Sequence, residues 1–127
     1  MKVKDLFSLP WKNMDRALEY GVEECKYLGK TLLGITLSNG LGFIIYFNPY
    51  SEEIYRILIM SPEKKELGEF FGVFKYEGGN TFFIYTVTNL TQIVNSLGEI
   101  EVNSVEVIKD VFEDFLLEAL AGQRNIY

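Results

Sequence analysis

An Asn39-Gly40 dipeptide separates two runs of apolar and β-branched residues, at positions 31–38 and 41–47. Asparagine and glycine both tolerate the positive φ values of a type I′ turn, so this pattern favours a two-residue β-hairpin. A turn at Asn48-Pro49 follows, and residues 54–60 form a third apolar run. Three strands joined by short turns predict an antiparallel meander.

A second hairpin is predicted further along the chain. Two runs rich in aromatic residues, at positions 70–76 and 81–88, flank the sequence Glu77-Gly78-Gly79-Asn80. Glycine and asparagine adopt the backbone conformations that tight turns need. The sequence therefore predicts five strands in one mainly antiparallel sheet.

Two longer segments have the apolar spacing of amphipathic helices. Apolar residues recur at intervals of three and four over residues 12–28 and again over residues 104–121. This spacing places them on one face of a helix. Gly29 and Gly122 follow these segments, and glycine is the residue preferred just after a helix C-terminus.

Two shorter helices are predicted from their first residues. Ser61-Pro62-Glu63 combines a capping serine, a proline that fits the first helical position and an early acidic residue. Such a helix would end by Gly68. Asn89, with Gln92 three positions later, resembles a capping box and predicts a helix over residues 90–97.

The predicted order is helix, three strands, short helix, two strands, short helix and long helix. Strands and helices that are grouped in this way predict an α+β fold, with the helices packed on a five-stranded sheet. The 127 residues contain no repeat and no linker-like tract. The sequence therefore predicts a single domain over residues 1–127.

The predicted strands are apolar on both faces. Alternation places Phe70, Phe74 and Tyr76 on one side of their strand and Phe71 and Val73 on the other. A sheet that is apolar on both faces must be covered on both, by helices of the same chain or by a second copy. The side chains predicted to form an interaction surface are Phe74, Tyr76, Phe83, Tyr85, Phe112 and Phe115.

The composition removes several classes of chemistry. The chain has no histidine, so it lacks the commonest general base and metal ligand. The single cysteine, Cys25, has no imidazole partner and no second cysteine with which to form a disulfide. No phosphate-binding glycine motif is present. We therefore expect a protein that is not an enzyme and that binds no cofactor or metal.

The charge balance and the apolar runs bear on partners and location. Twelve basic and eighteen acidic residues give a net charge of −6, which weighs against nucleic acid and anionic membranes as partners. The sequence begins without a signal-peptide pattern, and no apolar run approaches the ~20 residues that span a bilayer. We expect a cytoplasmic protein.

Two features resemble known proteins. Gly40-Leu41-Gly42-Phe43 resembles the carboxylate-binding loop of PDZ domains. A PDZ domain lacks the leading helix predicted here, so we interpret this segment as part of a hairpin. The predicted element order, length and acidity resemble the small dimeric chaperones of bacterial type III secretion, apart from the helix over residues 90–97. This second resemblance implies a dimer that binds other proteins.

Three functions remain open at this stage. The first is a non-enzymatic protein-interaction or chaperone-like module that acts as a homodimer. The alternative is a small-molecule sensor or carrier with an aromatic pocket, to which Tyr46, Tyr55, Tyr76 and Tyr85 would contribute hydroxyl groups. An enzyme that uses carboxylates alone, as glycosidases do, is a third hypothesis.

Overall fold

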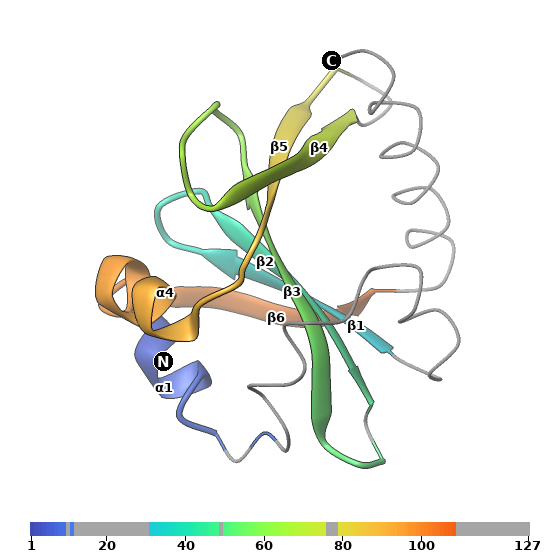
Figure 1. The fold of residues 1–127 in the computed structure, drawn as a ribbon, viewed down its shortest axis with the longest axis vertical. Helices are drawn as coiled ribbons and strands as arrows, with labels where there is room; N and C mark the ends of the chain where they lie inside the picture. The colour runs from blue at the N-terminus through green and yellow to red at the C-terminus, as the bar shows by residue number, and fades with distance from the viewer. Residues whose placement is uncertain (10, 12–30, 49, 76–78, 109–127) are drawn as a thin grey trace.

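The computed structural model describes residues 1–9, 11, 31–48, 50–75 and 79–108. Within them, the strands form one twisted sheet, and the two short helices lie next to each other at one end of it (Figure 1). The elements in chain order are α1 (Val3–Leu6), β1 (Thr31–Leu37), β2 (Gly42–Asn48), β3 (Glu53–Ser61), β4 (Glu69–Lys75), β5 (Thr81–Thr86), α4 (Leu90–Leu97) and β6 (Val102–Ile108).

The sheet has the strand order β4-β5-β3-β2-β1-β6, and every neighbouring pair is antiparallel. The predicted meander of β1, β2 and β3 and the predicted hairpin of β4 and β5 are confirmed. β5 pairs with β3, and β6 adds a strand beside β1. The sheet therefore has six strands rather than the predicted five, and β4 and β6 are its edges.

The turn between β1 and β2 differs from the predicted type I′ turn. The Leu37 N–H donates to the Leu41 carbonyl at 2.9 Å, and the Gly40 N–H donates to the Leu37 carbonyl at 3.2 Å. Gly40 has a φ of 89°, whereas Asn39 does not have a positive φ. The connection is thus a three-residue loop with glycine in the left-handed region. Asn39 uses its side chain, whose Oδ1 accepts from the Leu41 N–H at 3.1 Å.

The predicted helix over residues 104–121 is wrong at its start, because residues 104–108 belong to β6. β6 is rich in β-branched residues, which favour a strand. Pairing with β1 also satisfies the backbone hydrogen-bonding groups of β6. This long-range pairing cannot be predicted from the local spacing of apolar residues. Residues 109–121, and the helix predicted over residues 12–28, lie outside the described residues.

The short helix predicted from Ser61 is also wrong. Ser61 is the last residue of β3 and pairs with Phe83 of β5. Its Oγ donates to the Glu63 carbonyl at 2.6 Å and accepts from the Glu63 N–H at 3.3 Å. The Lys65 N–H donates to the Tyr85 hydroxyl at 2.9 Å. Side chains therefore satisfy the backbone in this connection, and residues 62–68 contain no helix.

The helix predicted over residues 90–97 is confirmed as α4. Asn89 caps it, with its Oδ1 accepting from the Gln92 N–H at 3.2 Å. After the helix, the Gly98 carbonyl accepts from the Lys4 N–H of α1 at 3.0 Å. Ile93 and Leu97 point into the core. The cap and this backbone contact hold α1 and α4 together against the sheet.

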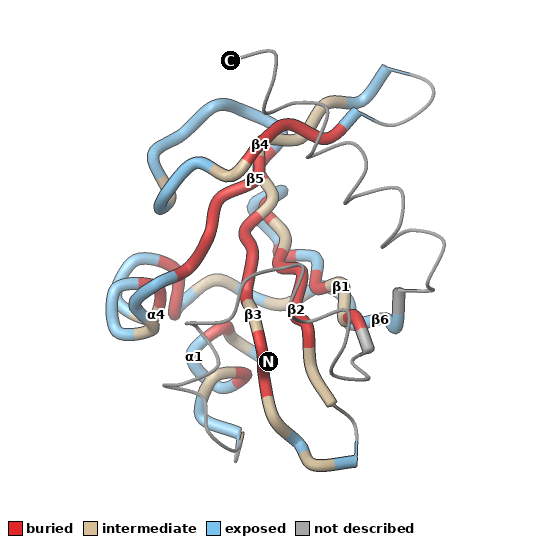
Figure 2. Tube along the Cα trace, turned by 45° about the vertical axis from the view of Figure 1, so that its right-hand side comes forward, coloured by how far each residue is buried: buried red, intermediate tan, exposed pale blue. Residues whose placement is uncertain are grey.

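Buried apolar side chains form two clusters, one on each face of the sheet, which confirms the predicted two-sided character. Figure 2 shows the buried residues in red, many of them in the central strands. The cluster on the helix-covered face consists of Val3, Leu6, Ile35, Leu37, Leu41, Phe43, Ile45, Ile54, Ile57, Ile59, Tyr85, Val87, Ile93 and Leu97. The cluster on the opposite side, here called the far face, consists of Leu32, Ile44, Tyr46, Tyr55, Leu58, Phe74 and Ile84.

A β-bulge in β4 changes which aromatic residues share a face. Phe70 pairs with Tyr85 and Gly72 pairs with Ile84, so Phe71 is an extra residue in the ladder. The Phe70 ring contacts the ring of Tyr85, which belongs to the helix-covered face, whereas Phe74 belongs to the far face. The prediction that Phe70 and Phe74 share one face is therefore wrong, because the bulge shifts the alternation by one residue.

Candidate interaction surface

Among the residues that the structure describes, no strand pairs with the outer edge of β6 over most of its length. On one side, β6 pairs with β1. On the other side, its first residues meet the N-terminus: the Val102 N–H donates to the Met1 carbonyl at 2.8 Å, and Lys2 forms a bridge with Glu101. Residues 103–107 have no strand partner on this side among the residues that the structure describes. Their outward backbone groups are therefore available for pairing with another strand.

Two valines on β6 expose apolar surface beside this open edge. Val105 is 50% exposed and Val107 is 63% exposed. Their cross-strand partners on β1 are Ile35 and Leu33, which pack in the cluster on the helix-covered face. The apolar surface of that face thus continues onto β6, where it meets solvent.

The other edge of the sheet has features that discourage pairing. β4 contains the bulge at Phe71, and its two ends carry the exposed charges of Glu69 and Lys75. Bulges and charged residues are common devices that keep edge strands from pairing with other chains. β6 has an irregularity of its own at Asn103, but from Ser104 to Val107 it pairs regularly with β1 and carries one charged residue, Glu106. This part of β6 is therefore the edge better suited to an interaction.

The sequence contained a signal for this strand that the helical spacing obscured. Val105 and Val107 alternate with Ser104 and Glu106, which is the period-two pattern of a half-buried strand. Val105 also fits an apolar helical spacing with residues further along the chain. The alternation is correct for residues 104–108, whereas the β1–β6 register shifts at Asn103, and it would have placed both valines on one face of a strand.

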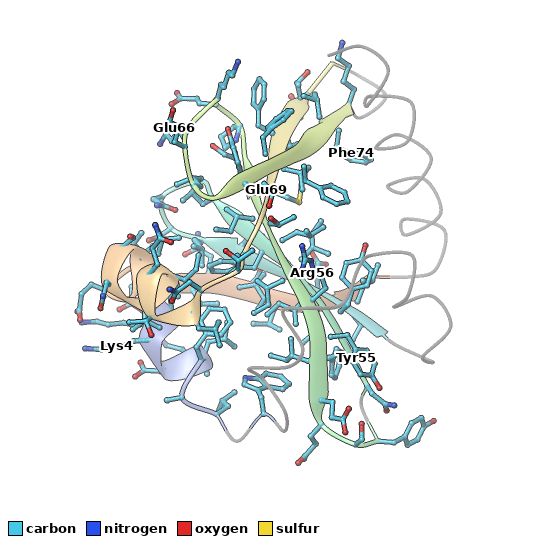
Figure 3. All side chains as sticks on the ribbon, viewed as in Figure 1. Lys4, Tyr55, Arg56, Glu66, Glu69 and Phe74 are labelled. Carbon is cyan, nitrogen blue, oxygen red and sulfur yellow. The ribbon has the colours of Figure 1, made fainter. Side chains whose placement is uncertain are left out.

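The aromatic residues predicted to form an interaction surface lie elsewhere. Phe74 is fully buried on the far face, and in Figure 3 it projects from β4 away from the two helices. Tyr85 is 3% exposed and Phe83 is partly buried, both on the helix-covered face. Phe74 and Tyr85 are core residues and offer no surface to a partner in this structure. Tyr76, Phe112 and Phe115 lie outside the described residues.

The tyrosines of the alternative hypothesis do not converge on one pocket. Tyr46 and Tyr55 belong to the far-face cluster, whereas Tyr85 belongs to the cluster on the other face. All three are buried. Tyr76 lies outside the described residues. An aromatic pocket built from Tyr46, Tyr55 and Tyr85 is therefore not formed.

An exposed charge cluster holds the N-terminal segment against the chain that leads into β6. Glu99 accepts hydrogen bonds from the Lys2 Nζ at 2.7 Å and from the Lys4 Nζ at 2.8 Å. These two bonds and the lysine charges lower the pKa of the Glu99 carboxyl to about 2, and Glu99 in turn raises the pKa of Lys2. The cluster helps to place Met1 and Lys2 beside Glu101 and Val102, short of the open part of the edge.

Comparison with known proteins returns no relative. No family model matches the sequence, and no curated protein or solved structure is significantly similar to it. The resemblance to type III secretion chaperones thus depends on the predicted element order, which the structure changes in residues 62–68 and 102–108.

The described part of the chain has neither a metal-binding cluster nor a helix that could span a membrane. No three Asp, Glu, Cys or His side chains there are grouped closely enough to hold a metal ion. In the same residues, neither helix has the length and apolar character needed to cross a membrane.

Proposed function

We propose that this protein is a non-enzymatic protein-interaction module that acts as a homodimer, with two copies joined edge to edge along β6. The observation that carries the proposal is the exposure of Val105 and Val107 on a strand whose outer edge is open. Main-chain hydrogen bonds between two such edges would supply pairing, and the valines would supply apolar contact. The two sheets would then continue into each other.

The chemistry of β6 selects a register for the pairing. A two-fold axis at Val105 places each Val105 opposite Val105 of the partner subunit. Glu106 then lies opposite Ser104 of the partner subunit. An axis at Glu106 would instead place two carboxylates directly opposite each other, which is unfavourable. The proposed dimer is therefore centred on Val105.

A second copy suits this edge better than an unrelated strand does. An antiparallel pair with a two-fold axis at Val105 uses the same strand twice, so Val105 meets Val105 of the partner subunit and Val107 lies diagonally across from it. Residues 103–107 carry a single charge although the chain as a whole has a net charge of −6. Pairing along this strand therefore brings few like charges of the two acidic copies together.

Light scattering at several protein concentrations tests the proposal. We expect the wild-type protein to have the mass of two chains and Val107→Lys, which places an ammonium group in the apolar contact, to have the mass of one. Tyr50→Lys is the matched control, because Tyr50 is 95% exposed and lies in the β2–β3 turn. This control should remain dimeric.

Circular dichroism establishes whether each variant is folded. A wild-type protein that is monomeric at every concentration contradicts the proposal. So does a folded Val107→Lys variant that is as dimeric as the control.

A further inference from the structure

The far face of the sheet contains a hollow whose floor lacks side chains. Its volume is about 490 Å³, within the range of pockets that bind small molecules. In the β1–β2 register, Gly34 pairs with Ile44 and Gly42 pairs with Thr36. Each of these cross-strand pairs contains a glycine, so the backbone of the two strands is exposed between the surrounding side chains.

Close packing explains why one of these positions is glycine. A Cβ atom on Gly42 would lie 3.1 Å from the Ile35 carbonyl oxygen, closer than a methyl group normally approaches a backbone oxygen. A larger residue at this position would require the hairpin to shift. The floor of the hollow is therefore a consequence of how closely β1 and β2 approach each other.

The walls are apolar and carry one charge. Ile44 of β2, Met60 of β3 and Phe82 of β5 line the hollow with aliphatic, thioether and aromatic groups. Glu106 of β6, which pairs with Gly34, contributes the only charged side chain among the described lining residues. Glu106 has no ion pair with any residue that the structure describes. The described residues that line the hollow include no lysine or arginine.

We infer that this hollow binds a primary amine carried on a flat aromatic ring. The ring lies over the exposed backbone at Gly34 and Gly42, between Glu106 on one side and Met60 and Phe82 on the other. Thioethers and aromatic rings both pack favourably against aromatic groups. The ammonium group lies at Glu106, since a carboxylate without a basic neighbour complements a cation. The ligand occupies the face of the sheet and the proposed dimer uses its edge, although β6 contributes Glu106 and Val107 to the hollow.

Isothermal titration of the full chain with three indole compounds of similar size tests the inference. Tryptamine carries a cation, tryptophol is neutral, and indole-3-propionate carries an anion. We expect saturable binding in which tryptamine is the tightest and indole-3-propionate the weakest ligand. Glu106→Gln should weaken the binding of tryptamine by about two- to fivefold, which is the range for one exposed ion pair, and should leave the affinity for tryptophol unchanged.

Three further variants separate charge from shape. Thr36→Trp, whose new side chain would fill the hollow, should abolish binding of tryptamine and tryptophol. Glu106→Lys should make indole-3-propionate bind more tightly than tryptamine. Because Glu106 is exposed, this test does not require the fold to tolerate a larger group in the hollow. Glu52→Gln, in the β2–β3 turn, is the control and should bind like the wild type.

The inference is overturned if the folded wild-type protein shows no saturable binding of tryptamine at millimolar concentration. Equal affinity for all three compounds would also overturn it, as would a Glu106→Lys variant that still prefers tryptamine.

Discussion

Val105 lies directly opposite Ile35 in the β1–β6 register, yet Val105 is 50% exposed and Ile35 is 2% exposed. The two side chains are on the same face of the sheet and one strand apart. The transition from core to surface therefore occurs within a single step between strands, and it leaves β-branched apolar groups in solvent. An edge of this kind is what a sheet presents when it is extended by another strand.

Truncation of Phe74 tests the far-face cluster. Phe74 is fully buried together with Leu58 and Ile84. Phe74→Ala should lower the free energy of unfolding by about 3–5 kcal/mol, because it removes a large apolar side chain and leaves a cavity. Tyr50→Ala, at a position that is 95% exposed, should change it by less than about 0.5 kcal/mol. Urea denaturation followed by circular dichroism measures both values, and similar losses in the two variants would contradict the described burial.

Gly68 and Gly79 form a pair that separates steric contact from backbone conformation. Both have positive φ values, of 155° and 102°. A Cβ on Gly68 would collide with the Thr86 carbonyl oxygen, whereas no atom lies within 4 Å of a Cβ on Gly79. Gly68→Ala should therefore lower the free energy of unfolding by more than Gly79→Ala does. Strained backbone costs about 1–3 kcal/mol, and each loss should lie within or above this range. Equal losses on thermal unfolding would show that β5 does not approach Gly68 this closely.

The Glu99 cluster predicts a dependence of stability on pH. Its pKa is lowered from 4.5 to about 2 in the folded protein, so the folded state favours the charged carboxylate. The stabilising contribution is complete above the ordinary pKa and is lost as the pH falls through the folded-state value. The melting temperature of Glu99→Gln should therefore lie below that of the wild type at neutral pH, and the difference should shrink toward about pH 2.

The effect of Glu99 should be small and sensitive to salt, because the cluster is exposed to solvent. Glu52→Gln, which removes a carboxylate far from these lysines, controls for net charge. A difference between Glu99→Gln and the wild type that does not vary with pH would show that the hydrogen bonds to Lys2 and Lys4 are not the cause.

The hairpins and α4 could be predicted from the sequence because their signals are local. The turn residues around Gly40 and Gly79 interrupt apolar runs, and the Asn89 cap immediately precedes its helix. Segment 104–108 could not be assigned in this way, because its apolar residues fit both a strand and a helix. Pairing with β1, which lies more than sixty residues earlier in the chain, determines the outcome.

The candidate site could not be predicted because exposure depends on which elements cover each face. The aromatic side chains of Phe74 and Tyr85 are the most conspicuous apolar groups of their strands, but both are enclosed. The bulge at Phe71 also separated residues that simple alternation had placed together. The exposed apolar groups of the candidate site are two valines on a strand that was not predicted.

Disulfide trapping tests the central claim, the pairing of two copies along β6, most directly. In a Cys25→Ser background, the proposed axis at Val105 brings the Cα atoms of two Val105→Cys residues to about 4.5–5.5 Å, a separation that a disulfide can span. The account predicts that Val105→Cys forms a covalent dimer rapidly under mild oxidation, whereas the exposed control Tyr50→Cys forms one slowly. Equal rates for the two variants, or no covalent dimer of Val105→Cys, would contradict it.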